Sequence, residues 1–280
     1  MREMLEVRFT EAKAQTLLGE NVGTVISGGS VRLVKLPIDD PAWSKVSAAE
    51  AEARSRNSAL VIYWNITRSY TAAELAQAEL IQLIQGCMFE PAGEECGTTY
   101  DYSSACQFCG GGRVQTSDLR LDTRTIPHRC DIAFTIAREE VVVSDRTVRL
   151  IHDRGFTGAL LRPVQSTLQS NGSRSEWKQL TFSSRPVEVA ATSRFGVTPF
   201  DLTSYGRCPL GHVAGHDILT ALSIQRDSWD GADFVRTRQL VGGRSGLIAP
   251  WPLILVSQPC YQALKKGAYK GFVPEVVHVV

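Results

Sequence analysis

Two segments of the chain share the same order of apolar and polar positions. Each has an apolar run, a serine, a short stretch with helical spacing, a glycine and a second apolar run, and the spacing from serine to glycine is identical. Serine favours the N-cap of a helix and glycine favours the turn after it, so both copies predict a strand, a short helix and a second strand. The landmarks are Val141–Val143, Ser144 and Gly158 in the first copy and Leu253–Val256, Ser257 and Gly271 in the second.

Capping and periodic signals predict further helices. Thr71 and Glu74 form a capping-box pattern, and apolar residues follow at helical spacing until Gly86, which predicts one helix that ends there. Ser47–Arg56 is alanine-rich and charged, as in an exposed helix, and Asp217–Ile224 also has a helical pattern. Strand-like runs complete the pattern at Gly23–Ile26, Val31–Leu36, Leu60–Trp64, Ile132–Thr135 and Lys178–Ala190.

These elements predict an α+β fold in which mixed sheets pack against a few helices. The polar segment Gln165–Glu176 is rich in serine, asparagine and glycine, as in a linker or an exposed hairpin tip. We therefore expect an N-terminal region, residues 1–165, with the first copy of the repeat, and a C-terminal region, residues 166–280, with the second. The boundary is soft, and one continuous body is the alternative.

The charge balance argues against nonspecific electrostatic binding. The 280 residues include 30 basic and 29 acidic side chains, for a net charge of +1, so we expect no strong attraction to nucleic acid or to an anionic membrane. The N-terminus lacks the apolar core of a signal peptide, and no apolar run approaches the length of a membrane span. The resulting expectation is a cytoplasmic protein.

Seven cysteines at irregular spacing argue against a disulfide framework and for reduced thiols. We expect Cys87, Cys130 and Cys260 to be small buried apolar side chains. The other thiols are the better candidates for metal ligands.

Cys106 and Cys109 give the sharpest local signal. Two thiolates separated by two residues can both face one tetrahedral ion, and the glycines that follow permit a tight turn. The surrounding sequence is too poor in apolar residues to be held by packing alone, which favours a structural zinc ion. Metal-free structural cysteines are the alternative, and redox catalysis is disfavoured because the motif follows a loop instead of a strand. The candidates for a further ligand are Cys96 first, and then Cys87, Cys130 and His128.

A second cluster contains Cys208, His212 and His216. The two histidines are four residues apart and would share one face of a helix, although the glycines between them weaken helical structure. One interpretation is that these side chains bond the backbone of a loop. The other is that they complete the Cys106 and Cys109 site from across the fold.

Trp229, Asp230, Asp233 and Arg236 combine carboxylates, a guanidinium and an indole ring. Such a mixture suits a protein interface, and a plain aspartate-glycine turn with local ion pairs is the alternative. Catalytic motifs are missing, since no serine lies in a nucleophile elbow. The glycine-rich stretches match no nucleotide-binding spacing, so we expect no nucleotide cofactor.

Taken together, several motifs resemble a pattern found in uncharacterised bacterial proteins. Their order is similar to that of the myxobacterial proteins with two Cys-x-x-Cys-Gly motifs, some of which look like immunity proteins against toxins delivered between cells. The resemblance implies a cytoplasmic binding protein with a metal knuckle and no catalysis. It covers residues 95–164, and this chain has Cys208 to His212 where the second pair would lie. The residues that carry it are Cys96 to Asp101, Cys106, Cys109 and Gly110, Asp131, Ile132 and Thr135, and Val143 and Ser144 with Gly155 to Gly158.

The sequence therefore predicts, first, a protein-binding module with structural zinc, most concretely a toxin-neutralising immunity protein that acts through an interface with residues such as Trp229, Asp230, Asp233 and Arg236. A second hypothesis is a zinc hydrolase in which Cys208, His212 or His216 holds the ion near Asp230 or Asp233. A third is a nucleic-acid-binding knuckle protein. Its candidate basic residues are Arg113, Arg120, Arg124 and Arg129.

Overall fold

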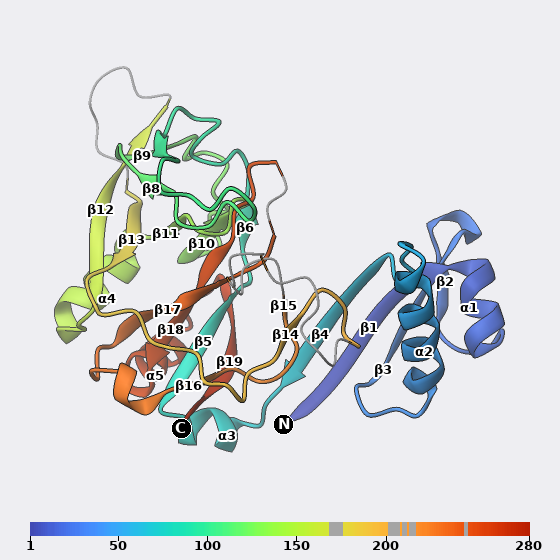
Figure 1. The fold of residues 1–280 in the computed structure, drawn as a ribbon. Helices are drawn as coiled ribbons and strands as arrows, with labels where there is room; N and C mark the ends of the chain where they lie inside the picture. Colours follow the sequence, from blue (N-terminus) through green and yellow to red (C-terminus); the bar gives the residue numbers. More distant parts are fainter. Residues whose placement is uncertain (168–175, 201–207, 209–211, 213–216, 244–245) are drawn as a thin grey trace. The chain divides into compact units, whose positions relative to one another are not determined.

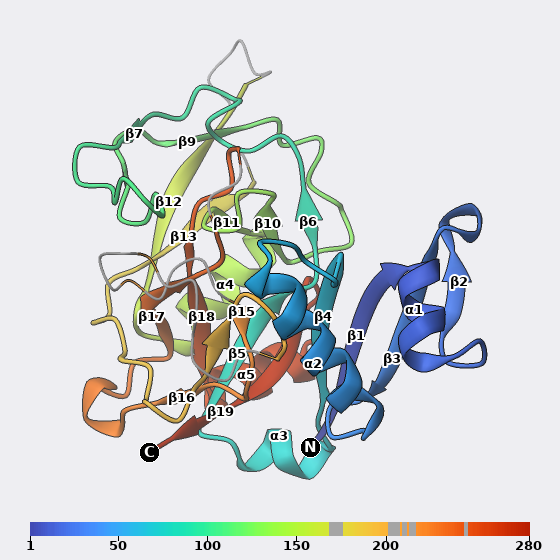
Figure 2. The same cartoon turned by 45° about the vertical axis from the view of Figure 1, so that its right-hand side comes forward.

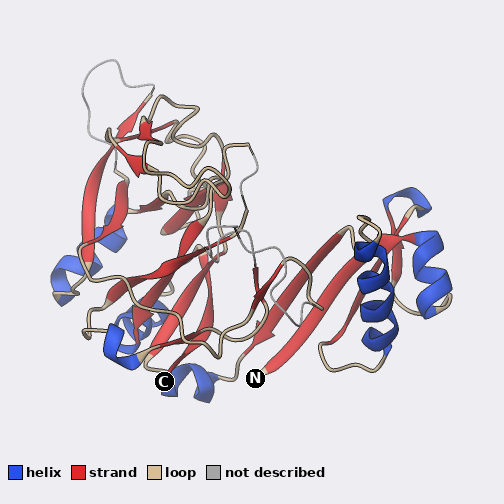
Figure 3. Cartoon of the chain, in the orientation of Figure 1, coloured by secondary structure: helices blue, strands red, loops and turns tan. Residues whose placement is uncertain are grey.

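The computed structural model describes residues 1–167, 176–200, 208, 212, 217–243 and 246–280. This part of the chain has the predicted α+β fold, with five α-helices and several sheets (Figure 3). It divides into two compact units, which are described separately. Unit 1 is Met1–Thr71 with Phe195–Tyr205, and unit 2 is Ala72–Arg194 with Gly206–Val280.

Unit 1 is built on an antiparallel sheet of four strands in the order β2-β3-β1-β4 (Figure 1). Alternate residues of β1, such as Leu5, Val7 and Phe9, are buried, as expected when one face of a sheet is covered. The predicted helix at Ser47–Arg56 is confirmed, but it starts earlier and buries Trp43. The elements are β1 (Arg2–Thr10), α1 (Glu11–Leu18), β2 (Thr24–Ile26), β3 (Val31–Pro37), α2 (Ala42–Ser55), β4 (Tyr63–Ser69) and β14 (Phe195–Gly196).

Unit 2 contains two larger sheets of mixed direction and most of the strands. One sheet has the order β6-β10-β11-β13-β12-β9, and the other has the order β16-β19-β5-β18-β17. Figure 2 shows β12, β13, β11 and β10 in this sequence across the first sheet. The elements before the first repeated helix are α3 (Ala72–Gln77), β5 (Leu80–Gln85), β6 (Met88–Phe89), β7 (Tyr100–Asp101), β8 (Val114–Gln115), β9 (Leu119–Leu121), β10 (Ile132–Thr135) and β11 (Val141–Val143). The remaining ones are α4 (Asp145–Arg154), β12 (Ala159–Ser166), β13 (Lys178–Phe182), β15 (Asp217–Ile218), β16 (Ser223–Ile224), β17 (Phe234–Val241), β18 (Trp251–Ser257), α5 (Gln258–Lys266) and β19 (Phe272–Val279).

Two helix predictions are wrong. The helix expected from Thr71 to Gly86 ends at Gln77, and Leu80–Gln85 forms β5. β5 lies between two strands of its sheet and its first four residues, Leu80 to Leu83, are all buried, so burial does not alternate along the strand. Periodicity alone cannot distinguish such a run from a buried helix. Asp217–Ile224 contains the short strands β15 and β16 instead of a helix.

The duplicated element is present in both predicted places. Ser144 caps α4 by accepting a hydrogen bond from the backbone N–H of Thr147, and Ser257 caps α5 by accepting one from Cys260. Each helix connects two strands of one sheet, β11 to β12 and β18 to β19. Serine capping therefore starts both helices, as the pattern indicates.

The structure extends the duplication well beyond the helix. β9, β10, β11, α4 and β12 follow one another in the chain as β16, β17, β18, α5 and β19 do. Within the sheets, β12 pairs in parallel with β9, and β19 pairs in parallel with β16. Likewise β10 pairs antiparallel with β11, and β17 pairs antiparallel with β18. We name these two sets the first and the second repeat.

The two repeats exchange one strand. β5 precedes the first repeat in the chain but lies between β18 and β19 of the second, antiparallel to both. β13 precedes the second repeat but lies between β11 and β12 of the first, again antiparallel to both. Gln82 of β5 and Gln179 of β13 occupy equivalent, buried positions. Neither sheet is complete without a strand from the other half of unit 2.

An aspartate fastens each repeat to the other. Asp131 accepts a hydrogen bond from Ser144 Oγ at 3.3 Å in its own repeat. Its second carboxylate oxygen accepts a bond at 2.9 Å from the backbone N–H of Lys270, in the turn between α5 and β19 of the other repeat. The carboxylate therefore bonds a helix-capping residue and a turn from two different repeats.

Asp233 makes the same set of bonds in the opposite direction. It accepts from Ser257 Oγ at 2.5 Å in its own repeat and from the backbone N–H of Thr157 at 2.9 Å in the first repeat. Thr157 follows Ser144 at the spacing at which Lys270 follows Ser257. We call these two arrangements the aspartate clasps, and they give unit 2 an approximate internal twofold relation.

The expected division at residues 165 and 166 is not a division between the compact units. β12 and β13 flank residues 168–175 and pair antiparallel inside unit 2. Residues 168–175, which make up most of the segment expected to be a linker or a hairpin tip, lie outside the described residues.

The expectation of reduced thiols is wrong for one pair. Cys87 and Cys130 form a disulfide with an S–S distance of 2.12 Å. They are 43 residues apart, and they meet because Cys87, just after β5, bonds the backbone of β10 at Phe134. Both cysteines are buried in an apolar cluster, as predicted, and Cys260 is buried as a free thiol. In the described part of the chain, no helix is both long enough and apolar enough to cross a membrane.

The glycines beside the clasps give the first testable prediction. Gly158 and Gly271 have positive φ angles, and a Cβ at either position would overlap a carbonyl oxygen of the opposite repeat, that of Phe234 or of Ile132. We expect Gly158→Ala and Gly271→Ala each to lower the free energy of unfolding by at least about 3 kcal/mol in urea titrations, because the backbones must separate.

Gly155→Ala is the matched control. Gly155 also has a positive φ, but a Cβ there would meet no atom within 4 Å. We expect a cost of only about 1 kcal/mol from the left-handed conformation. Equal losses for all three variants would show that the close approach of the two repeats does not limit stability.

Candidate metal centre

Four side chains from two distant parts of the sequence meet in unit 2. Cys106, Cys109, Cys208 and His212 each offer one ligand atom, and these four atoms all lie within 4.8 Å of one another. Cys106 Sγ lies 3.4 Å from Cys208 Sγ, and Cys109 Sγ lies 3.6 Å from His212 Nδ1. In a tetrahedral site with metal–sulfur bonds of about 2.3 Å, ligand atoms are separated by about 3.7 Å. The arrangement can therefore hold a metal ion.

The first two ligands belong to a tight loop, residues 102–113, which we call the knuckle. Its ends are joined by the β7–β8 ladder, in which Tyr100 pairs with Gln115. Inside the loop, the N–H of Cys106 donates to Gly111 and the N–H of Gly110 donates to Cys106. Gly110 and Gly112 have positive φ angles, which glycine adopts without strain. This geometry turns both sulfurs to the same side of the loop.

The surroundings of Cys106 and Cys109 shift the pKa values of their thiols in opposite directions. Hydrogen bonds from the backbone N–H groups of Cys109 and Phe108 lower the pKa of Cys106 to about 6. Burial raises the pKa of Cys109 to about 11. Metal ligation requires the thiolate form, so the N–H groups directed at Cys106 favour the state that binds a metal.

Apolar contact shields the site on one side. Cys106, Cys109 and Cys208 are buried together, and Leu240 of β17 packs against them. Gly111 leaves room for this contact, since a Cβ there would lie 3.1 Å from the Leu240 side chain. His212 is the one exposed member of the group.

The sequence identified all four residues of the group, together with candidates that do not join it: Cys96, His128, and Cys87 and Cys130, which form the disulfide. Cys208 and His212 complete the Cys106 and Cys109 site from across the fold, which was one of the two interpretations of the second cluster. Cys96 is not in the group; it is half-buried and its backbone bonds Ala92 and Gly93. His128 is exposed, and His216 lies outside the described residues.

The residues expected at an interface have different roles. Asp230 accepts from the N–H of Ala232 in a local turn, and Trp229 donates to the carbonyl of the same residue. Asp233 belongs to a clasp. Arg236 lines a cavity that is described below. The structure therefore brings Trp229 and Asp230 together in one turn and gives Asp233 a role inside the fold.

The arginines that follow Cys109 are engaged in part with carboxylates. Arg113 bonds Glu139 at 2.6 Å and Glu94 at 3.1 Å, and its side chain is buried. Arg124 forms an ion pair with Asp122 at 2.9 Å. Two of the four arginines are thus neutralised locally.

Sequence reasoning missed the function of Asp131 and Asp233. A signal was available, because Asp131 and Thr135 frame an apolar strand in the way that Asp233 and Thr237 do. The hairpin between β17 and β18 is longer than that between β10 and β11, so Asp233 lies further from Ser257 in the sequence than Asp131 lies from Ser144. This difference in spacing hides the correspondence between the two aspartates. Arg138 and Trp251, which contact each other at the cavity, had no local signal.

The chain matches no model of a known protein family, and no curated protein matches it. The chemistry of the site is therefore argued from its own geometry.

Metal content tests the assignment of the ligands. We expect the purified protein to carry one divalent metal ion per chain, measured by mass spectrometry, because the four ligand atoms form a single group. Cys106→Ser removes a ligand of the knuckle and Cys208→Ser removes one of the distant segment, and each change should release the ion. The melting temperature should fall by roughly 10 °C, since metal binding contributes to folding.

Cys96→Ser is the control for this experiment, because it removes a thiol of unit 2 that lies outside the group. It should keep the full metal content. Metal loss in Cys96→Ser, or full retention in Cys208→Ser, would contradict the ligand set.

Proposed function

We propose that this protein is a non-enzymatic, cytoplasmic protein-binding module with one structural zinc ion, and that it acts as an immunity protein that neutralises a toxin. The observation that carries the proposal is the set of four ligand atoms from Cys106, Cys109, Cys208 and His212. Three thiolates and an imidazole are a typical donor set of structural zinc. Four protein ligands fill the tetrahedral positions, whereas a catalytic zinc keeps one position for water.

The surface of the knuckle supports a binding role. Large apolar side chains that are exposed in unit 2 include Tyr102, Phe108 and Val114, which lie on the knuckle or at its end. Phe108 is 60% exposed and lies between the two cysteine ligands. A metal that fixes the loop would present these side chains in one conformation, and pre-organised aromatic residues are common anchors of protein interfaces.

The zinc-hydrolase alternative has less support. Asp233, one of its two candidate carboxylates, bonds Ser257 and Thr157, and Asp230 bonds its own turn. Neither carboxylate belongs to the group of metal-binding side chains among the described residues. The nucleic-acid alternative is weakened because Arg113 and Arg124 are paired with carboxylates.

A metal-release comparison separates structural from catalytic zinc. For a structural ion, we expect His212→Ala to lose zinc and to melt at a lower temperature, as Cys106→Ser does. A His212→Ala variant that loses zinc with an unchanged melting temperature would instead favour an open, catalytic site.

The immunity function is tested by growth. We expect bacteria that express the toxic product of a gene adjacent to that of this protein to grow only when this protein is also present. Phe108→Ala should reduce the rescue at least tenfold, since truncating a central aromatic anchor commonly costs more than about 2 kcal/mol of binding.

Leu160→Ala is the matched control, because Leu160 is a similarly exposed apolar residue of unit 2 on β12. It should leave rescue unchanged, and both variants should retain zinc and their melting temperature. If the wild-type protein gives no rescue and binds no product of a neighbouring gene, the immunity proposal fails.

A further inference from the structure

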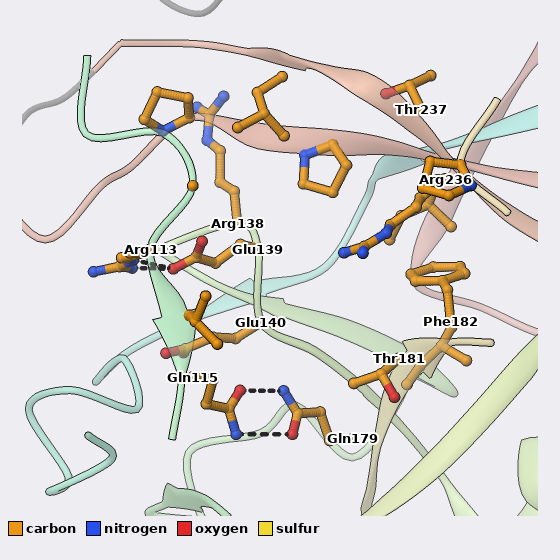
Figure 4. A pocket seen from close by; sticks show the side chains of 18 of the residues that line it. Arg113, Gln115, Arg138, Glu139, Glu140, Gln179, Thr181, Phe182, Arg236 and Thr237 are labelled. Carbon is orange, nitrogen blue, oxygen red and sulfur yellow. Dashed lines mark hydrogen bonds and ion pairs between the residues drawn. The ribbon is translucent and has the colours of Figure 1, made fainter. Parts of the chain in front are cut away.

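Unit 2 contains a cavity of about 550 Å³ whose walls come from both repeats. Its lining includes β8, β13, β17, β18 and the turn between β10 and β11. Figure 4 shows Arg236 on one side, the Arg113–Glu139 pair on the other, and the reciprocal amide pair of Gln115 and Gln179 at one end. Cavities of this size commonly hold organic ligands.

The walls of the cavity are rich in arginine. Three of its arginines are matched by carboxylates: Arg113 by Glu139, Arg162 by Asp118 at 3.4 Å, and Arg238 by Glu188 at 2.6 Å. A further carboxylate, that of Glu140, accepts bonds from Tyr100, Thr135 and the backbone of Gly93. Two cationic side chains in the lining, Arg138 and Arg236, have no carboxylate partner in the described part of the chain.

Arg236 differs sharply from its equivalent in the first repeat. Arg236 pairs with Ile254 in the β17–β18 ladder, and Phe134 pairs with Val141 at the same place in the β10–β11 ladder. Phe134 is fully buried, whereas Arg236 is exposed and projects into the cavity. The same structural position therefore fills the core in one repeat and presents a free guanidinium to a cavity in the other.

Arg138 is held in an unusual conformation. It has a φ angle of +64° at the tip of the β10–β11 turn, which is uncommon for a residue other than glycine. Its guanidinium stacks on the ring of Trp251 at 4.5 Å, and its Nε is buried without a hydrogen-bond partner. Gly242 makes room for this ring, since a Cβ there would overlap it.

The cavity also has an apolar side. Phe182 of β13, Pro252 and Ile254 of β18 and Leu240 of β17 contribute to its lining. Leu240 also packs on the cysteine ligands, and Gly112 and Arg113, at the end of the knuckle, belong to the same wall. The knuckle therefore forms part of the cavity.

We propose that this cavity binds a small amphipathic organic anion. Its carboxylate or phosphate group bonds the guanidinium of Arg236, and the positive charge of Arg138 in the same lining (Figure 4) adds to the attraction. An apolar body packs against Phe182 and Ile254. A guanidinium group bonds both kinds of oxyanion in a bidentate manner. This binding site is additional to the protein-binding function and does not depend on it.

Isothermal titration with three aromatic probes tests the proposal. Phenyl phosphate and benzoate carry an anionic group on one ring, and benzyl alcohol is a neutral analogue. We expect at least one anion to bind the full-length protein with a Kd below about 1 mM and at least tenfold more tightly than benzyl alcohol. The ratio between the two anions tells whether the natural ligand is a phosphate or a carboxylate.

Arg236→Gln should weaken binding of the anion at least tenfold, and Arg138→Gln should weaken it by a smaller factor, because it removes a positive charge from the lining but not the direct bonds. Arg149→Gln is the control, because Arg149 is an exposed arginine of α4 that does not line the cavity. It should bind the anion as the wild type does, and equal melting temperatures and metal contents would show that all three variants are folded. The proposal is overturned if neither anion binds, if benzyl alcohol binds equally well, or if Arg149→Gln weakens binding as much as Arg236→Gln.

Discussion

The aspartate clasps are the interaction on which unit 2 depends. Each carboxylate receives a hydrogen bond from the serine that caps a helix in its own repeat and one from a backbone N–H in the opposite repeat. Hydrogen bonds to a charged group contribute about 1.5–3 kcal/mol each, and an unpaired carboxylate left at such a contact would be costly. Capping of the helix and docking of the repeats therefore share one side chain.

The strand exchange follows from the same arrangement. Because β5 completes the second sheet and β13 completes the first, neither repeat can form its full sheet alone. Gly158 and Gly271 let the two clasped turns approach the neighbouring strands closely. Each turn also bonds the residue that follows an exchanged strand: the N–H of Gly86, after β5, donates to Gly271, and the N–H of Ser183, after β13, donates to Gly158. The contacts that define unit 2 thus join distant parts of the sequence, which predicts slow folding relative to a fold with local contacts.

The sequence was a good guide where a structure depends on neighbouring residues. The serine caps, the repeated helices and the knuckle cysteines all have local patterns, and the structure has each of them in its predicted place. The sequence was a poor guide where the secondary structure or the partner of a residue depends on segments that are distant in the chain. Successive residues of β5 are buried, so side chains on both faces of the strand are covered, and the spacing of its apolar residues also fits a buried helix.

The same reason explains the cysteines and the cavity. Cys87 and Cys130 meet only because the chain after β5 forms β6, which pairs with β10, so spacing carried no sign of their disulfide. Cys96 is nearer in sequence to the knuckle than Cys208 is, yet Cys208 and not Cys96 belongs to the group of possible metal ligands. Arg138 and Arg236 come from different repeats, and no local motif could have associated them.

The candidate metal centre also follows the duplication. Cys106 and Cys109 lie in the connection between β5 and β9, which joins the exchanged strand to the first repeat. Cys208 and His212 lie in the equivalent connection between β13 and β16, which joins the other exchanged strand to the second repeat. Each half of unit 2 therefore supplies two of the four possible ligands. A metal ion at this place would link the two connections, as the clasps link the two turns, and its loss would loosen the wall of the cavity that Gly112 and Arg113 form.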